Sequence, residues 1–467
     1  MQKNQFFRQG IVLTAVSFFM RVTGIIYRSY LARSMGTEGV GLYQLIFTVF
    51  TLSVTLSTSG ISLAVTRIVS ARLVKGRSDT VRSAVSRCLG YCLCVSCSIA
   101  VIFLMLAPTL ADRLLGTEQA APALRMLAVG LPFMSVCTCM RGYFLAVDES
   151  LSTISGDLTE QLLTIGLTIG LFSWMHLQTP TDACMLAMAS SSTGEIAGCL
   201  LTWCLYRRSL KRHTPPKGVR SKGIFRSLLH IALPGTMSSA ARNLLGTTEN
   251  LMIPRGLRQF GASYSEAMSA YGVLQGMAYP ALFFPSAFLT AFSSLLIPQV
   301  AKAHAANRQA YIRHVTHRAL AATLAFGSAA MVFFLFFGKE TGRWLYNSDT
   351  AGFYLQLLAP LVILMYLDGV VASILKGLDE QFSSFKYNVT DSSIRVILVA
   401  FLLPRFGLSA YICILFFSTI FNASLSIHRL LKVTDLKIDL LHDLILPLAV
   451  SSALAAVVKC FLLWFGK

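Results

Sequence analysis

The stretch VLTAVSFFMRVTGIIYRSYLARSMGTEGVGLYQ, residues 12–44, decides the class of fold. It begins with an apolar segment long enough to span a membrane, passes through a short glycine-containing turn, and enters a second apolar run. Arg21 and Arg28 lie inside the first segment, where an arginine at mid-bilayer depth costs about 2.5 to 3.5 kcal/mol on insertion scales. The two arginines are two helical turns apart and project from about the same side. The stretch therefore predicts a first helix with one cationic face.

The composition indicates that lipid is the main solvent of this chain. Of its 467 residues, 55% are hydrophobic and 13% are charged, whereas a soluble globular protein carries about 25% charged residues. We expect the first apolar run to be retained, because it is too long and too closely followed by a second run to be a cleaved signal peptide. Thirteen runs can each span about 30 Å of hydrocarbon: 11–33, 41–67, 84–107, 121–147, 157–176, 182–206, 226–249, 268–297, 316–338, 352–376, 385–403, 407–428 and 443–465.

The charge distribution predicts the orientation of the chain. The net charge is +19, and the Lys and Arg residues are concentrated in alternate connections, including 72–82, 207–222 and 302–313. By the positive-inside rule these connections are cytoplasmic and so is the N-terminus. We expect the basic loops to set the topology and to attract anionic membrane lipids, and we expect no nucleic-acid partner.

The longest polar connection divides the chain into two parts of similar length. It carries seven Lys or Arg residues together with Pro215 and Pro216, a composition typical of a linker between packed bundles. The predicted parts are an N-lobe of helices one to six at 1–206, a basic cytoplasmic linker at 207–225, a C-lobe of helices seven to twelve at 226–430, and an extra C-terminal transmembrane helix at 431–467.

Faint sequence repeats favour an internal duplication. Residues 140–142 precede Asp148 and Glu149 at the end of the fourth run, and residues 375–377 precede Asp379 and Glu380 at the end of the tenth. In a similar way, GLYQ at the start of the second run resembles YGVLQ in the eighth. Six helices in each half would give the two halves the same orientation in the membrane.

Prolines interrupt several of the apolar runs. Each removes an intrahelical hydrogen bond and can kink its helix. The kinks serve either packing alone or bending during alternating access, and the sequence leaves both interpretations open. The interrupting residues are Pro132, Pro234, Pro280, Pro285 and Pro360.

Charged residues at membrane depth are the strongest candidates for a functional site. Those without an obvious neighbour in sequence must be compensated across helices or by a ligand. Asp391 and Arg395, by contrast, are spaced i,i+4 and can neutralise each other locally. The candidate cavity residues are Arg21, Arg28, Arg242, Glu195 and Asp368, together with Tyr271 and Gln275 from the start of the eighth run.

The sequence has no signature of an enzyme. It lacks a Gly-rich phosphate loop, a metal-spaced pair of His or Cys in a polar loop, and a nucleophile elbow. The eleven cysteines lie almost all inside apolar runs, where we interpret them as packing residues. We therefore expect no catalytic residue, no metal and no cofactor.

Short motifs along nearly the whole chain point to one family. They occur at 28–44, 56–67, 141–144, 253–257, 271–278 and 403–408, and their order and spacing make the set specific. The chain resembles the stage V sporulation protein B group of polysaccharide transporters. That group is similar to lipid II flippases, and it shares the multidrug/oligosaccharidyl-lipid/polysaccharide (MOP) exporter superfamily with the multidrug and toxic-compound extruders (MATE).

The resemblance implies an all-α, polytopic membrane protein with a MATE-like fold. Its two pseudo-symmetric six-helix lobes would surround a central cavity, with at least one further helix at the C-terminus. Members usually have fourteen helices, whereas thirteen runs are present here, so thirteen or fourteen is the expected number. The resemblance also implies that first-helix arginines, here Arg21 and Arg28, line the cavity of a bacterial cytoplasmic-membrane protein that carries lipid-linked sugars. We expect a monomer, with cell-wall synthesis proteins as candidate partners.

Three functional hypotheses follow. The leading one is a flippase for an undecaprenyl-pyrophosphate-linked precursor of peptidoglycan or another envelope polysaccharide, working by alternating access with an ion gradient or the membrane potential as a bias. Arginine suits this role because it pairs bidentately with phosphate oxygens and stays charged. The second is a drug or organic-cation antiporter, with Glu195 and Asp368 as its acids. The third is a polytopic membrane glycosyl- or acyltransferase, which would need acid clusters in a polar loop.

Overall fold

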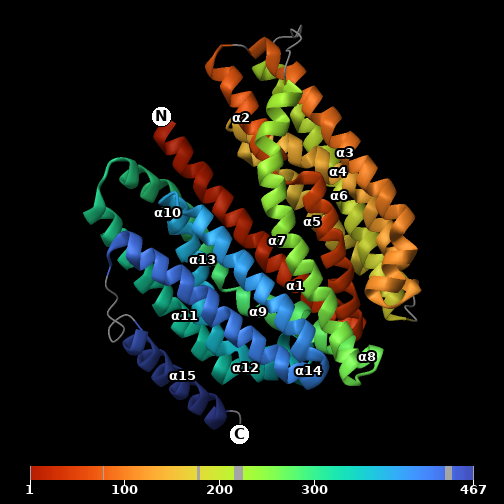
Figure 1. Cartoon of the computed structure of the whole chain (residues 1–467), viewed down its shortest axis with the longest axis vertical. Helices are drawn as coiled ribbons and strands as arrows, with labels where there is room; N and C mark the ends of the chain where they lie inside the picture. Colours follow the sequence, from red (N-terminus) through yellow and green to blue (C-terminus); the bar gives the residue numbers. More distant parts are fainter. Residues whose placement is uncertain (1, 77, 176–178, 215–223, 437–443, 466–467) are drawn as a thin grey trace. The chain divides into compact units, whose positions relative to one another are not determined.

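The structure is a computed structural model that describes residues 2–76, 78–175, 179–214, 224–436 and 444–465. Of the residues in these ranges, 94% are helical and none forms a strand (Figure 1). The helix expected at 182–206 continues to His213, so the predicted linker begins as helix. Pro215 and Pro216 of that linker lie outside the described residues.

Helices cover most of each predicted apolar run, although 176 and 443 lie outside the described residues and the runs at 41–67 and 268–297 each cross a helix break. In chain order, the elements are α1 Gln2–Thr58, α2 Ile61–Val74, η1 Ser78–Thr80, α3 Val81–Leu110, η2 Ala111–Leu115, η3 Glu118–Ala120, α4 Ala121–Ala146, α5 Ser150–Trp174, α6 Pro180–His213, α7 Ile224–Phe260, α8 Tyr264–Tyr271, η4 Gly272–Ala278, α9 Tyr279–Phe283, α10 Ser286–Ala305, α11 Gln309–Tyr346, α12 Asp349–Leu358, η5 Ala359–Leu361, α13 Val362–Gly377, α14 Gln381–Thr434 and α15 Leu446–Phe465.

Two of these helices contain a break at a glycine. Gly36 divides α1 with φ 71°, and Gly407 divides α14 with φ 62°. Both values lie in the left-handed region, which glycine occupies without the clash that a Cβ atom would bring. The break in α1 separates the first two predicted runs, and the break in α14 separates the runs at 385–403 and 407–428.

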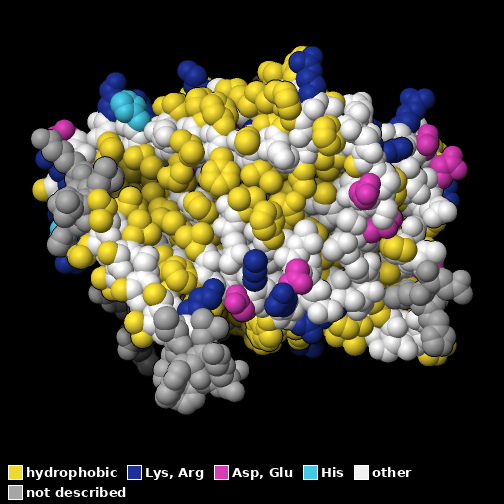
Figure 2. Space-filling model, turned by 90° about the horizontal axis from the view of Figure 1, so that it is seen from below, with side chains coloured by type: hydrophobic (Ala, Val, Ile, Leu, Met, Phe, Trp, Pro, Cys, Tyr) yellow, Lys and Arg dark blue, Asp and Glu magenta, His cyan; other side chains and the backbone are white. Residues whose placement is uncertain are grey.

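The protein is a multi-pass membrane protein. Seven helices of the described chain are long and apolar enough to cross a membrane, and the count is eight if one bent pair forms a single span. The predicted count of thirteen or fourteen is therefore not confirmed. Figure 2 shows a face on which hydrophobic side chains cover much of the middle, while most Lys and Arg side chains in view lie toward its edges.

The chain forms two compact units. Unit 1 comprises Met1–Met20 and Leu42–Leu251, and unit 2 comprises Arg21–Gly41 and Met252–Lys467. Both α1 and α7 therefore contribute to both units. This division differs from the predicted lobes, whose boundaries were placed in the polar linker, and the lobes as moving bodies stay a prediction.

Unit 1 is packed around small residues and cysteines. Its core is formed by α2, α3, α4, α6 and the first part of α7, and it includes buried Cys88, Cys92 and Cys139. These cysteines are free thiols in apolar surroundings, in agreement with the packing role predicted for them. On the neighbouring helix pair, Gly194 and Gly198 of α6 leave room for the backbone of α5. Small residues thus set how closely these helices approach.

Unit 2 depends on a close backbone contact between α1 and the start of the eighth predicted run. A Cβ atom at Gly41 would overlap the carbonyl oxygen of Met268, and one at Gly272 would overlap the carbonyl oxygen of Thr37. Only glycine at both positions allows this approach. The contact fixes residues 37–41 of α1 against α8 and the π-helical segment η4.

The repeated Asp-Glu motif adopts the same turn in both units. Asp148 after α4 has φ 59°, and Asp379 after α13 has φ 63°. The amide nitrogens of Glu149 and Glu380 each donate to the carbonyl five residues earlier at 2.9 Å. Aspartate tolerates this left-handed conformation better than most residues do. The sequence match therefore reflects a repeated helix ending.

The glutamate of each repeated turn also meets the last helix of its half. Glu149 lies 3.8 Å from the ring Nδ1 of His213 at the end of α6. Glu380 accepts two hydrogen bonds from Arg429 of α14, at 2.6 and 3.2 Å. These bonds lower the pKa of the Glu380 carboxyl below its ordinary value. The same relation between helices thus recurs in each unit, which supports the predicted duplication.

We expect Gly272→Ala to destabilise the protein, because the new methyl group would meet backbone atoms that cannot rotate away. Overpacking of this kind costs about 1–3 kcal/mol and should lower the melting temperature of the purified protein in detergent. Gly170→Ala in α5 is the matched control, since a Cβ atom there meets nothing within 4 Å. It should leave the melting temperature unchanged or raise it. Equal melting temperatures for the two variants would contradict the role assigned to the glycine contact.

Candidate functional site

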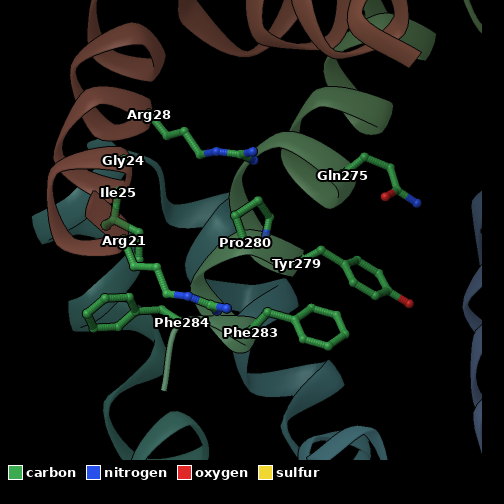
Figure 3. Close-up of a pocket in the computed structure, with 9 residues that line it drawn as sticks. All are labelled: Arg21, Gly24, Ile25, Arg28, Gln275, Tyr279, Pro280, Phe283 and Phe284. Carbon is green, nitrogen blue, oxygen red and sulfur yellow. The ribbon is translucent and has the colours of Figure 1, made fainter. Parts of the chain in front are cut away.

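A cavity of about 480 Å³ opens in unit 2 between α1 and the broken helix formed by η4 and α9 (Figure 3). The α1 residues lie at positions 21, 24, 25 and 28, which is the spacing of a single helix face. The opposite wall follows the same periodicity from position 275 to 284. The lining residues are Arg21, Gly24, Ile25, Arg28, Gln275, Tyr279, Pro280, Phe283 and Phe284.

The second wall is broken where the sequence carries its prolines. The segment Gly272–Ala278 is π-helical, Pro280 stands at the start of α9, and Pro285 precedes α10. The helix bends by 58° at this break. Insertions of this kind are frequent at functional sites, and irregular backbone at membrane depth is tolerated where it lines a polar cavity. The prolines at 280 and 285 therefore mark the site.

The cavity is cationic. Arg21 and Arg28 are both exposed, and no carboxylate is among the residues that line it. Within the described chain, neither guanidinium has a hydrogen bond or an ion pair with a protein group, although the charge of Arg28 acts on the buried Tyr346. In Figure 3 both side chains extend from α1 toward η4 and α9. Two cations without an acidic partner make this an anion-binding geometry.

A third arginine on α1 has a structural role instead. Arg33 donates from Nε to the carbonyl oxygen of Leu345 at 3.2 Å and from its terminal nitrogen to that of Trp344. The hydroxyl of Ser29 also donates to Leu345. These bonds satisfy carbonyl groups at the end of α11, which have no intrahelical partner. Arg33 thus stabilises the fold, whereas Arg21 and Arg28 face the cavity.

The two polar residues predicted from the eighth run are placed differently. Gln275 lines the cavity, and its amide donates to the hydroxyl of Tyr411 at 2.9 Å. Tyr271 is only 1% exposed and does not line the cavity. Its position beside Gly272 places it in the helix contact.

Two of the predicted residues belong to unit 1 and are not part of this cavity. Glu195 on α6 is buried, and its carboxyl group lies close to that of Glu160 on α5. Arg242 is exposed on α7. Both stay predictions as substrate-binding residues.

Asp368 faces another helix of unit 2 and does not line the cavity. Its carboxylate is hydrogen-bonded to Ser426 of α14, and its Oδ1 atom is buried without a hydrogen-bond partner among the described residues. Nearby, Asp391 accepts a hydrogen bond from Ser418 at 2.6 Å, and its other oxygen lies 3.6 Å from Nε of Arg395. The local pair predicted between Asp391 and Arg395 is present.

Sequence reasoning missed the aromatic wall of the cavity. Tyr279 and Phe283 stack with ring centroids 6.1 Å apart, and Phe284 lines the cavity beside them. The sequence does contain a pattern that predicts this wall, because these aromatic residues follow Gln275 at helical spacing and surround Pro280. It was overlooked because aromatic residues in an apolar run usually form core contacts.

Unit 1 has a larger cavity of about 820 Å³ with a strongly basic lining. It includes Arg82 from α3 and Arg207, Arg208 and Lys211 from α6. The Arg207 guanidinium lies 5.5 Å from the ring centroid of Trp203, which also lines this cavity. A basic group beside a tryptophan is typical of protein surfaces that contact lipid headgroups.

Known proteins share both sequence and fold with this chain. The family described as Polysaccharide biosynthesis protein matches residues 6–304. Stage V sporulation protein B of Bacillus subtilis (strain 168) is 26% identical over 384 residues, which is 81% of this chain and 74% of that protein. Lipid II flippase MurJ of the same organism is 21% identical over 399 residues, 80% of this chain and 73% of that protein.

The comparison with solved structures agrees on the fold. The structure of lipid II flippase MurJ in an inward closed conformation matches with a TM-score of 0.74 at 14% sequence identity, covering 97% of this chain and 93% of that chain. An inward-facing multidrug resistance transporter of the MATE family and MOP superfamily matches with a TM-score of 0.67, also at 14% identity, covering 90% and 97%. The fold is therefore that of MOP-superfamily transporters.

The charge of the cavity can be tested with thiol reagents. A cysteine introduced by Ile25→Cys lies between the two arginines, so an anionic methanethiosulfonate should modify it about tenfold faster than a cationic one. The exposed Cys94, Cys97, Cys204 and Cys413 are first replaced by serine. The rates are followed by mass spectrometry of the purified protein.

The matched control carries the same cysteine with Arg21→Gln and Arg28→Gln. The preference for the anionic reagent should disappear in this background. A cavity that reacts equally with both reagents, with or without the arginines, would contradict the anion-binding geometry.

Proposed function

Because this chain belongs to the polysaccharide biosynthesis protein family, we propose that it is a flippase for an undecaprenyl-pyrophosphate-linked precursor of the cell envelope, either lipid II or a polysaccharide repeat unit. The observation that carries the proposal is the pair Arg21 and Arg28 in a cavity without an acid. The chain is a membrane transporter and not an enzyme, so the membrane-transferase hypothesis is wrong.

The chemistry of the substrate explains why arginine is needed. A lipid-linked diphosphate presents several anionic oxygens and a headgroup that cannot cross hydrocarbon unaided. Arginine donates in a planar fork that matches phosphate oxygens, and it stays charged in a partly dry cavity. A hydrogen bond to a charged group contributes about 1.5–3 kcal/mol. The cost of two guanidinium groups at membrane depth is in turn offset when the anion binds.

We propose that transport follows alternating access across the bacterial cytoplasmic membrane, with the N-terminus in the cytoplasm. The N-lobe at 1–206 and the C-lobe at 226–430 would be the moving parts, and the extra helix at 431–467 would add to the C-lobe. The break between α9 and α10 offers a bending point in the cavity wall. An ion gradient or the membrane potential would favour either the inward-facing or the outward-facing conformation, since moving one charge across the membrane changes the free energy by about 2.3 kcal/mol per 100 mV.

The proposed partners follow from charge. The diphosphate lipid would occupy the cavity of unit 2. Anionic membrane lipids would contact the basic cavity of unit 1, which carries four cations and a tryptophan. We propose a monomeric transporter that receives its substrate from, or delivers it to, proteins of cell-wall synthesis.

A cation antiporter is the second candidate, because MATE transporters have the same fold. Its acids would be Glu195 and Asp368. The carboxyl group of Glu195 lies close to that of Glu160, however, and Asp368 lies toward α14. The cationic cavity of unit 2 would repel a cationic drug, so this candidate is the weaker of the two.

We expect Arg21→Ala and Arg28→Ala each to weaken binding of a polyprenyl-diphosphate-linked sugar by about 10- to 150-fold, the equivalent of one charge-assisted hydrogen bond. Translocation of a fluorescent lipid-linked sugar in proteoliposomes should fall in parallel. Arg405→Ala removes one exposed cation outside the cavity and is the charge-matched control. It should bind and translocate like the unaltered protein.

A reconstituted protein that translocates no labelled lipid-linked sugar would contradict the proposal. So would a double variant lacking Arg21 and Arg28 that transports at the normal rate. Complementation of a bacterial strain depleted of its lipid II flippase, with and without the two arginines, then tests whether lipid II itself is the substrate.

We further expect no ion-gradient-driven efflux of cationic dyes from cells that express the protein. The physical reason is the repulsion between a cationic dye and the two guanidinium groups. Ethidium efflux is measured in a strain without its own extruders, with a known MATE transporter as the positive control. Efflux that is lost in an Asp368→Asn variant would favour the antiporter instead.

A further inference from the structure

A second cavity of about 300 Å³ lies between α10 and α13 in unit 2. It shares Arg21 and Phe283 with the cationic cavity, so the two cavities meet at the Arg21 side chain. Arg21 is its one charged lining residue. The other lining residues are Ser286, Leu289, Thr290, Ser293, Met365, Tyr366, Gly369, Val370 and Ser373.

The lining is rich in hydroxyl groups that can accept hydrogen bonds. Four of the five hydroxyls donate to backbone carbonyl groups, which leaves their oxygen lone pairs as acceptors. The donor-to-acceptor distances are 2.6 Å for Ser286, 2.9 Å for Thr290, 3.0 Å for Ser373 and 2.7 Å for Tyr366. The cavity therefore suits a group that brings several donors of its own.

Ser293 is the exception among these hydroxyls. It is only 3% exposed, and its oxygen is buried without a hydrogen-bond partner in the described part of the chain. Buried hydroxyl groups are nearly always paired, so this hydroxyl is free to bond a group that enters the adjoining cavity once its side chain rotates toward it. Ser293 can both donate to and accept from such a group.

The remaining lining offers apolar surface. Leu289, Met365 and Val370 contribute aliphatic or thioether groups, and Tyr366 contributes a ring that is held in place by its hydroxyl bond and by Phe326, 6.1 Å away between centroids. Aromatic and apolar walls with a few polar groups are typical of small-molecule sites. A sugar ring has the matching character, because its hydroxyl groups lie at its edge and its CH groups form its faces.

We propose that this second cavity is a carbohydrate subsite that receives the sugar attached directly to the diphosphate. The inference rests on the proposed function. It concerns the sugar of the substrate, which the proposed function does not specify. Arg21 stands where phosphate and sugar would meet. A volume of about 300 Å³ is at the small end of the range for ligand pockets. The subsite therefore binds the first sugar and not a whole oligosaccharide.

The test compares two lipids on the purified full-length protein in nanodiscs. One is undecaprenyl diphosphate, and the other is undecaprenyl diphosphate with a single N-acetylhexosamine. The affinity of each is measured by native mass spectrometry. The unaltered protein should bind the glycosylated lipid about tenfold more tightly than the bare one, since the sugar adds hydrogen bonds.

Two variants remove the subsite without touching the arginines. Gly369→Leu places a side chain in the cavity, and a Cβ atom at Gly369 meets nothing within 4 Å, so the helix can accept it. Ser293→Ala removes the unpaired hydroxyl without adding volume. Gly170→Leu is the matched control, because that glycine is also exposed and has the same open surroundings in α5.

In Gly369→Leu the glycosylated lipid should bind only as tightly as the bare lipid, and in Ser293→Ala its affinity should fall about fivefold. Binding of the bare lipid should not change in either variant. The carbohydrate subsite is overturned if the unaltered protein does not distinguish the two lipids, or if both variants bind the glycosylated lipid normally. It is also overturned if they lose both lipids equally. Failure of the unaltered protein to bind either lipid overturns the proposed function instead.

Discussion

The contact between the backbones of Gly41 and Gly272 is the constraint on which unit 2 depends. It brings α1 against η4 at a distance that no Cβ atom would allow. Arg21 and Arg28 lie on the segment of α1 that precedes the break at Gly36, and the contact lies just after that break. The helix on the other side of the contact continues into the break at Pro280 and Pro285. The two glycines thus hold together the two chain segments that go on to form the walls of the cavity.

The cavity exists because the second wall is not a regular helix. The wall contains a π-helical segment and a 58° bend, and the cavity is lined by aromatic rings on this side and guanidinium groups on the other. Uncompensated arginine at membrane depth is unfavourable unless water or an anion reaches it. Packing and electrostatics therefore both agree with the proposal that this site binds a hydrated anion.

The repeated helix endings agree with the predicted internal duplication, which stays a prediction. Asp148 and Asp379 adopt the same left-handed turn, and the glutamate after each meets the last helix of its half. Duplication of this kind is common among transporters that expose one site alternately to two sides of a membrane. The described residues are not symmetric in their chemistry, because the cavity lined by Arg21 and Arg28 belongs to unit 2 and the neighbouring Glu160 and Glu195 belong to unit 1.

The sequence by itself determined that the chain is a helical membrane protein and which residues are candidates for its site. Apolar runs, the spacing of Arg21 and Arg28, and the positions of the prolines are local properties, and a helix expresses them directly. Only the tertiary structure decided which polar residues share a cavity. Gln275 joined the arginines, whereas Tyr271 was buried in the glycine contact and Asp368 turned toward Ser426. The aromatic wall and the hydroxyl-lined cavity also appeared only in the fold. The physical reason is that a helix presents several faces, and the backbone contacts between helices, not the sequence of any one of them, select the face that meets the cavity.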